Sequence, residues 1–364
     1  MAEQVRHRTT TELAPVRMES THNLLEVHDL KMYFPIRKGF FSQVVGYVKA
    51  VDGVSFSIKR GETLGLVGES GCGKSTIGRS IMRAYDVTSG SILYRQENGD
   101  VVDMATLSGD PLRLLRKDIR MIFQDPYSSL NPRMTVFDNI SEALQVEGAL
   151  PRSMIQDRVA YLLQRVGLRP EYMTRYPHAF SGGERQRIVI ARALVTNPRL
   201  IIADEAVSAL DVSVRAQILN LLEELQDEFQ LTYLFISHDL SVIRHLCDRV
   251  AVMYVGKLVE TATIDDLYRR PHHPYTEALL SAVPIANPRQ RGDNTRIRLA
   301  GEIADPSNPP KGCYFHPRCR YTQANCSAAE PMLLPVGESN GAPHLSACHY
   351  AETLQLKGVI SDEN

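Results

Sequence analysis

The sequence predicts an α/β fold built on a parallel sheet, and three apolar segments carry this prediction. Leu64 to Val67 reads as a short buried strand, which leads through a glycine-rich loop at residues 68–73 into a helix. Leu200 to Ala203 is a second buried strand, and it ends in two carboxylates. Thr232 to Ile236 is a third, and a serine and a histidine follow it. Polar side chains at the carboxyl ends of buried parallel strands are typical of ligand sites in α/β folds.

Length and composition limit the class of protein. The chain has 364 residues, 43% of them hydrophobic, so it can form one large domain and a smaller one. Its formal net charge of -1 provides no overall basic field, so we expect no nucleic-acid partner. No apolar run approaches the roughly 20 residues that span a bilayer, and residues 1–22 lack the apolar core of a secretion signal. These features predict a protein that stays in the cytosol.

The N-terminal part of the chain predicts a flexible tail followed by two strands. Residues 1–23 are polar and aperiodic. Alternation at 24–34 and 49–58 predicts two antiparallel strands, joined by a long loop at 35–46 that is rich in Pro, Gly and basic residues. Phe34 ends the first strand. There its ring either stacks on a nucleotide base or closes the edge of the domain.

The loop after the first buried strand reads GESGCGKS and predicts a phosphate site. Its glycines permit a close approach of the backbone, so that N–H groups turn onto an anion at a helix N-terminus. Lys74 supplies a charge for the outer phosphates, and Ser75 supplies a hydroxyl for Mg²⁺. The residues predicted to bind phosphate are Gly68, Ser70, Gly71, Cys72, Gly73, Lys74, Ser75 and Thr76.

The middle of the chain predicts a helical insert that interrupts the series of strands. Short strands are expected at 91–94 and 119–123, and Gln124 follows the second strand directly. Beyond them apolar residues recur at helical spacing, which places the insert at about 125–195. Ser181 to Glu184 opens the last helix of this region with two glycines, an arrangement that can hold another phosphate.

Acidic side chains and a histidine follow the later strands. Asp204 suits outer-sphere binding of Mg²⁺, and Glu205 is placed to polarise an attacking water. Asp211 lies in a tight turn before the next helix. His238, at the tip of the third buried strand, is placed to donate to a terminal phosphate. Asp204, Glu205 and His238 are expected at one edge of the sheet.

In their order and spacing, these motifs resemble those of an ABC-transporter ATPase subunit. They are the Walker A motif at 68–75, Gln124, the signature at 181–184, Asp204 with Glu205, Asp211 and His238. The resemblance implies an ABC nucleotide-binding domain at 24–267. This domain would have a RecA-like P-loop NTPase core, an antiparallel β subdomain and an inserted helical subdomain.

The resemblance also implies a role for each matching residue. Glu205 is the expected general base, Gln124 is expected to link the metal and the terminal phosphate to a membrane partner, and His238 is expected to contact that phosphate. Phe34 is expected to stack on adenine. The implied Mg²⁺ ligands are Ser75, Gln124 and Asp204. The residues implied to complete the ATP site of a facing subunit are Ser181, Gly182, Gly183 and Asp211.

Two further segments resemble the oligopeptide and dipeptide importer subgroup, namely DPYSSLN at 125–131 and RPHHPYTEALLSAVP at 270–284. Within it, the long loop at 35–46 is similar to that of the second of two paired ATPases. The implied function is ATP hydrolysis that drives peptide uptake. The implied partners are a second ATPase subunit, two transmembrane permease subunits and, indirectly, a substrate-binding protein. The implied location is peripheral, at the cytoplasmic face of the inner membrane.

Two other classes of protein share the phosphate loop. A soluble ABC ATPase of translation or DNA maintenance usually carries two nucleotide domains or long coiled-coil inserts, and neither is seen in this sequence. A small-molecule kinase leaves the motif at 181–184 and the turn at Asp211 unexplained. The transported substrate stays open, because a binding protein and the permease choose it in such systems.

Residues 268–350 predict a small irregular C-terminal extension, followed by a tail at 351–364. In a reducing cytosol its cysteines favour a metal site over disulfides, and their spacing leaves Zn²⁺, an iron–sulfur cluster and free thiols open. The resemblance implies a [4Fe-4S] cluster with a structural role. Three side chains, Arg318, His316 and His349, are expected to donate hydrogen bonds to the sulfurs. The cysteines concerned are Cys313, Cys319, Cys326 and Cys348.

Overall fold

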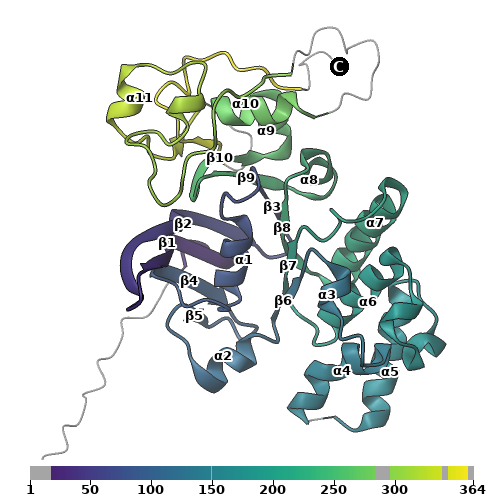
Figure 1. The fold of residues 1–364 in the computed structure, drawn as a ribbon. Coiled ribbons are helices and arrows are strands. Elements are labelled where there is room, and N and C mark those ends of the chain that lie inside the picture. Colours follow the sequence, from purple (N-terminus) through teal and green to yellow (C-terminus); the bar gives the residue numbers. More distant parts are fainter. Residues whose placement is uncertain (1–17, 149, 284–295, 338–342, 360–364) are drawn as a thin grey trace, which may run out of the picture.

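The computed structural model describes residues 18–148, 150–283, 296–337 and 343–359. Residues 1–17 of the predicted N-terminal tail, and residues 360–364 of the predicted C-terminal tail, lie outside these ranges. The described part is organised around two sheets, one of eight strands and one of four (Figure 1).

The eight-stranded sheet has the order β11-β12-β10-β9-β3-β8-β7-β6. Its strands from β6 to β9 pair in parallel, and β10, β12 and β11 continue it in antiparallel fashion. Every residue of β3, β7 and β8 is buried, and the prediction of an α/β fold is confirmed. The bounds are β3 Thr63–Val67, β6 Ile119–Ile122, β7 Leu200–Asp204, β8 Thr232–Ser237, β9 Arg249–Tyr254, β10 Lys257–Thr263, β11 Leu334–Pro335 and β12 Leu345–Ser346.

The helices between β6 and β7 gather in one group at the end of the sheet where β6 lies (Figure 1). Among the described residues, no helix is long and apolar enough to cross a bilayer. The α-helices are α1 Lys74–Ile81, α2 Gly109–Leu115, α3 Pro126–Ser129, α4 Val136–Glu147, α5 Arg152–Arg165, α6 Gly182–Leu194, α7 Val212–Phe229, α8 Leu240–Leu246, α9 Ile264–Arg269, α10 Pro274–Ser281 and α11 Ala324–Ala328. Short 3-10 turns are η1 Pro170–Thr174, η2 Pro177–Ala179 and η4 His316–Arg318.

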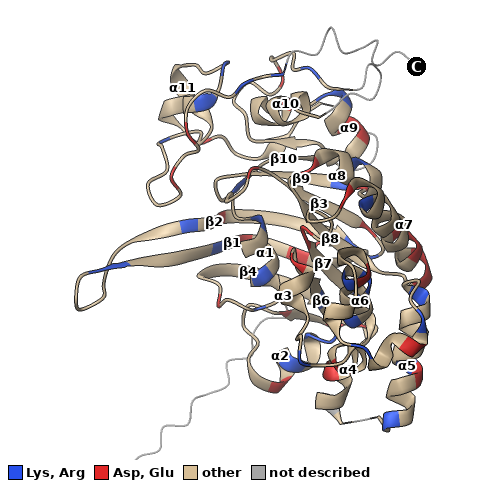
Figure 2. Ribbon diagram, turned by 45° about the vertical axis from the view of Figure 1, so that its right-hand side comes forward, with Lys and Arg blue, Asp and Glu red and all other residues tan. Residues whose placement is uncertain are grey.

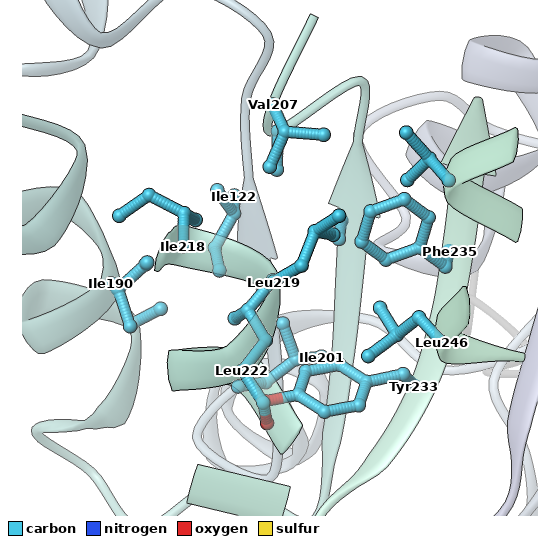
Figure 3. Packing of buried hydrophobic residues seen from close by; sticks show 14 of the residues in the cluster. Ile122, Ile190, Ile201, Val207, Ile218, Leu219, Leu222, Tyr233, Phe235 and Leu246 are labelled. Atoms are coloured by element: carbon cyan, nitrogen blue, oxygen red, sulfur yellow. The ribbon is translucent and has the colours of Figure 1, made fainter. Parts of the chain in front are cut away.

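The two faces of the eight-stranded sheet have separate hydrophobic cores. Successive strand residues point to opposite faces, so Tyr233 and Phe235 of β8 pack towards α6, α7 and α8 (Figure 3). Leu234 and Ile236 pack on the other face with Ile77 of α1 and with the antiparallel sheet. Burial is worth about 1.5–3 kcal/mol for each large apolar side chain, so both cores stabilise the central strands.

The antiparallel sheet has the order β2-β1-β4-β5. The prediction of a long loop at 35–46 is wrong, because Pro35 pairs with Tyr47 and Lys38 pairs with Gln43. Only residues 39–42 form the turn of this hairpin, which projects from the molecule (Figure 2). In the described part of the chain β4 pairs with β1 only as far as Lys31, so Pro35 lies where β1 has β2 on one side alone, a position that tolerates a missing N–H. The bounds are β1 Asn23–Lys38, β2 Gln43–Lys59, β4 Ser89–Arg95 and β5 Val101–Asp103.

The C-terminal extension continues the eight-stranded sheet. Glu260 and Thr261 of β10 pair with Ser346 and Leu345 of β12, and β12 in turn pairs with β11. Beyond α10, the rest of the described extension is irregular apart from η4 and α11, and it lies over β10 and α10 (Figure 1). This placement puts the extension next to the end of β9, close to the phosphate loop.

Candidate functional site

The loop between β3 and α1 contains two glycines that no other residue could replace. Gly73 has a φ of 110°, and a Cβ there would lie 2.0 Å from the carbonyl oxygen of Ala50. Gly68 has a φ of 152°, and a Cβ there would lie 2.2 Å from the carbonyl oxygen of Met253. The N-cap residue of α1 is Gly73, which has no side chain to cap the helix. The loop therefore presents a helix N-terminus that is suited to an anion.

Lys74 is buried, and its ammonium group bends back onto the loop. Nζ donates to the carbonyl oxygens of Gly68 (2.7 Å) and Glu69 (3.0 Å). Nζ also lies 3.7 Å from Sγ of Cys72, and burial raises the pKa of that thiol, which stays protonated at neutral pH. The positive charge is thus held inside the loop where phosphate is predicted to bind.

Asp204 and Glu205 end β7 beside this loop. Oγ of Ser75 donates to Oδ1 of Asp204 at 2.7 Å. Asp204 is buried, and this burial raises the pKa of its carboxyl, while the hydrogen bond from Ser75 opposes the rise. Glu205 has a φ of 50°, a left-handed conformation that residues other than glycine rarely adopt. The backbone turn at Glu205 separates the two neighbouring carboxylates, which contact different partners.

Gln124 and His238 converge on the carboxylate of Glu205. Nε2 of Gln124 donates to Oε2 at 2.8 Å, and Nδ1 of His238 lies 3.1 Å from Oε1. Gln124 follows β6 and His238 follows β8, and β7 lies between these two strands. The parallel order of the strands therefore brings a carboxylate, an amide and an imidazole to one edge of the sheet.

A cavity of about 760 Å³ opens at this edge. Ser75, Gln124 and Asp204 line it, together with Arg79 and Arg192, which were not predicted from the sequence. Arg79 lies one helical turn after Ser75 on α1, so helical spacing would have indicated it. Arg79, a hydroxyl and a buried carboxylate give the cavity groups that a phosphate ester with its metal requires, whereas Arg192 pairs with Glu142 at 2.9 Å.

Predicted residues from the β1–β2 hairpin and from the starts of α6 and α7 do not line this cavity. Ser181 is exposed and forms a capping box with Glu184 at the start of α6, and Gly182 and Gly183 follow it there. A Cβ on Gly183 would lie 2.6 Å from Cγ1 of Val214, so α6 packs closely on α7. Asp211 is exposed at the start of α7, and the half-buried ring of Phe34 packs edge-on against Tyr85 at 5.3 Å.

The four cysteines of the extension line one small cavity, although they are spread over 36 positions of the sequence, from Cys313 to Cys348. The backbone N–H of Cys313 donates to the carbonyl of Cys326 at 2.8 Å, which ties two of the segments together. Burial raises the pKa of the Cys313 thiol to about 11 and that of Cys348 to about 12. In the described ranges, no three His, Cys, Asp or Glu side chains form a group that could hold a metal ion as they stand.

The expected hydrogen bonds to the cysteine sulfurs are wrong for all three side chains. Nδ1 of His316 donates to the carbonyl of Cys313, and Nε2 of His349 donates to the carbonyl of Ala329, each at 2.9 Å. Arg318 turns away from Cys319 and reaches Glu69 in the phosphate loop. Carbonyl and carboxylate oxygens are stronger acceptors than a neutral thiol, and the planar guanidinium fits a carboxylate at two points.

Family models match two parts of the chain. Residues 51–208 match the ABC transporter family, and residues 259–326 match the family described as the oligopeptide/dipeptide transporter C-terminal region. Among solved structures, cbiO1 from Clostridium perfringens has a TM-score of 0.57 at 28% identity, covering 68% of this chain and 91% of that one. The ABC transporter cassette MJ0796 has a TM-score of 0.57 at 26% identity, covering 66% and 98%.

Similar proteins extend the match to nearly the whole chain. The oligopeptide transport ATP-binding protein AppF of Bacillus subtilis is 54% identical over 327 residues, covering 90% of this chain and 97% of AppF. The dipeptide transport ATP-binding protein DppF of Escherichia coli is 48% identical, covering 86% and 92%. The oligopeptide transport ATP-binding protein OppF of Salmonella typhimurium is 48% identical, covering 87% and 94%. The chain therefore belongs to the ABC transporter family, as an ATPase of the oligopeptide/dipeptide transporter group.

Proposed function

We propose that the chain hydrolyses ATP to drive uptake of di- or oligopeptides through a membrane permease. The observation that carries this proposal is the convergence of Gln124, His238 and Glu205 beside the Ser75–Asp204 pair and a glycine-lined helix N-terminus. The transport of peptides is proposed from the relatives, which are oligopeptide and dipeptide transport ATP-binding proteins.

In the proposed reaction, residues 68–76 bind the phosphates of ATP. Glu205 accepts the proton of a water whose oxygen attacks the terminal phosphorus, and the bond from that phosphorus to the bridging oxygen of ADP breaks. His238 donates to the terminal phosphate. Mg²⁺ supplies charge stabilisation when bound, and Ser75, Gln124 and Asp204 are the residues that would hold it. The close contact of Ser75 with Asp204 supports this ligand set.

The exposure of the signature supports a composite site with a second ATPase subunit. Ser181 and Asp211 are distant in sequence from the phosphate loop of their own chain. Because both are exposed, a facing subunit can reach them. We propose that Ser181, Gly182, Gly183 and Asp211 contact the nucleotide of that subunit, and that Phe34 stacks on adenine. Gln124 directly precedes the helical group from α3 to α6, which is the proposed docking site of the permease at the cytoplasmic face of the inner membrane. A substrate-binding protein would act through the permease.

We propose that the four cysteines hold a [4Fe-4S] cluster, with Zn²⁺ as the alternative. The convergence of four cysteines on one cavity, one of them buried and three half-buried, supports a shared ligand. Cys313, Cys319, Cys326 and Cys348 would hold either group through their thiolate sulfurs, which ligate both Zn²⁺ and iron–sulfur clusters. The bound group would supply a structural staple for an extension with little regular structure.

Anaerobic purification tests the cluster. The protein should be brown, with about four iron and four sulfide per chain, and Cys319→Ser should remove the colour and the iron. Cys247→Ser is the matched control, because Cys247 is a free cysteine that does not line the cavity of the four cysteines. Colourless protein that contains one zinc per chain would reject the cluster and support Zn²⁺ as the ligand. Metal-free protein with four titratable thiols would reject both metal assignments.

Uptake of a labelled tetrapeptide by cells that lack the chain tests the proposed function. Restored wild-type protein should return ATP-dependent uptake and should co-purify with membranes, whereas Glu205→Gln should co-purify without restoring uptake. Unimpaired uptake in cells that lack the chain would reject peptide transport. Recovery only in the membrane-free fraction would favour a soluble ABC ATPase of translation or DNA maintenance.

A further inference from the structure

Glu69, in the second position of the phosphate loop, is held at three points. Its backbone N–H donates to the hydroxyl oxygen of Tyr275 at 2.8 Å. Its carboxylate accepts from both terminal nitrogens of Arg318, at 2.7 Å and 3.1 Å. Its carbonyl accepts from Nζ of Lys74 at 3.0 Å. Two of the three partners therefore come from beyond residue 268, in the part of the chain that follows the nucleotide-binding core.

Arg318 is set rigidly for this contact. Its side chain is 7% exposed and lies over the ring of Tyr254, 5.9 Å from the centroid. Tyr254, Tyr275 and Phe315 pack against one another with centroid distances of 4.8 to 5.4 Å, and all three are buried. A guanidinium held in this way binds a carboxylate at two points with little loss of freedom, and truncating it leaves a carboxylate without its partner.

Contacts other than the Arg318–Glu69 pair already attach the extension. β12 pairs with β10, Arg320 pairs with Glu277 at 2.9 Å, and the N–H of Lys49 donates to the carbonyl of Pro306 at 3.0 Å. The first and last of these contacts fasten the extension to other parts of the core, and the Arg320–Glu277 pair joins two segments of the extension. The bond from Arg318 ends on the phosphate loop itself, at the residue whose carbonyl holds the ammonium group of Lys74.

We propose that Arg318 is a positioning residue of the ATP site, which holds Glu69 and through it the loop and Lys74 in the geometry that binds phosphate. The proposal rests on the proposed binding of ATP by residues 68–76. Because the charges of Glu69 and Arg318 cancel, the pair adds no net charge beside the loop, and its contribution is to orient the loop. Loss of Arg318 would free the loop and leave a bare carboxylate close to the phosphates, so nucleotide affinity should fall.

Titration of the full-length chain with MgATP, together with its steady-state ATPase kinetics, tests the proposal. Arg318→Gln should raise the Kd and the KM for ATP about tenfold and keep kcat within about twofold of the parent. The reason is that the substitution disturbs the loop geometry that binds ATP and leaves the groups that react in place. Arg318→Lys keeps the charge and loses the two-point contact, so its Kd and KM for ATP should lie between those of the parent and those of Arg318→Gln. Adding Glu69→Gln to Arg318→Gln should recover part of the affinity, because it removes the bare carboxylate.

Arg320→Gln is the matched control, because it breaks an ion pair of the same extension that does not reach the loop, and its Kd should match the parent. Equal losses in Arg318→Gln and Arg320→Gln would overturn the proposal in favour of a general loosening of the extension. Should Arg318→Gln fail to fold, Glu69→Gln alone decides, and an unchanged KM and Kd overturns the proposal.

Lys74→Ala separates this inference from the proposed function. If Lys74→Ala loses nucleotide binding and Arg318→Gln binds nucleotide as the parent does, the proposed role of Arg318 is rejected and the proposed function stands. Unchanged binding in Lys74→Ala would instead reject the phosphate loop as the nucleotide site, and with it both proposals.

Discussion

The phosphate loop and the C-terminal extension are held in place by different kinds of contact. The loop follows a strand whose residues are all buried, and its lysine bonds to carbonyls only five and six positions away. The extension has little regular structure beyond α10, and buried carboxylates of β10 and α10 hold it instead. Glu260, fully buried in β10, accepts from Nε2 of His344 at 2.7 Å and from the N–H of His273 at 3.0 Å.

Glu277 repeats this arrangement on α10. It is buried and accepts from Arg320 at 2.9 Å, from the hydroxyl of Tyr321 at 3.0 Å and from the N–H of Lys357 at 2.9 Å. The irregular extension is thus held by a few charge-assisted hydrogen bonds. The strand β3 and the phosphate loop are instead stabilised by many apolar contacts, each of which contributes little. Single substitutions should therefore change chemistry in the first region and attachment in the second.

Glu205→Gln should have the largest effect, and it should leave the fold of the first region intact. The substitution keeps the shape of the side chain and removes the base, so phosphate release should slow about 1,000-fold, or about 4 kcal/mol, while ATP still binds. ATP should then hold the two subunits together. Phosphate release within a few fold of the parent would remove Glu205 from the role of base.

Glu260→Ala should damage the second region most. Two backbone N–H groups and His344 would lose a buried acceptor, so the free energy of unfolding should fall by about 3 kcal/mol, with early proteolysis after residue 268. Glu330→Ala is the control, because Glu330 pairs with Lys257 at the surface and should cost less than about 0.5 kcal/mol. Equal effects of the two substitutions would contradict the contrast between buried and exposed carboxylates.

Acid should weaken the second region through His273. Burial lowers the pKa of this histidine to about 4, against a weaker opposing effect of Glu260. The unfolded chain binds the proton first, so stability is lost as the pH falls below about 6.5, by about 2 kcal/mol between pH 7 and pH 5. His273→Asn keeps a cap for α10 and should remove this slope from unfolding curves. His245→Asn, at an exposed site, should keep it.

Phe34→Ala should have the smallest effect, confined to nucleotide affinity. Loss of aromatic stacking should weaken binding of ATP by about 1 kcal/mol and leave turnover at saturating ATP largely intact. Tyr47→Ala, an exposed aromatic on the same hairpin, is the control. An unchanged dissociation constant in Phe34→Ala, with a change in Tyr47→Ala, would assign the stacking role to Tyr47.

The fold of the core was predictable because its signals are local. The all-apolar segments at 64–67, 200–203 and 232–236 become β3, β7 and β8, since such runs are stable only when both faces are covered. The hairpin of β1 and β2 was mispredicted. Proline, glycine and basic residues suggested a loop, but Val44 and Tyr47 favour extended backbone, and in the described part of the chain Pro35 lies where β1 has β2 on one side alone.

By itself the sequence determined the phosphate loop, the buried strands and the polar residues that end them, because glycine, lysine and apolar runs act over a few neighbouring positions. Only the tertiary structure decided that Arg318 binds Glu69, 249 positions away, and not a cysteine sulfur next to it. An arginine beside a cysteine has several acceptors within reach along the chain. Which one it takes depends on the buried rings of Tyr254 and Phe315 that orient it, and packing between distant segments sets that direction.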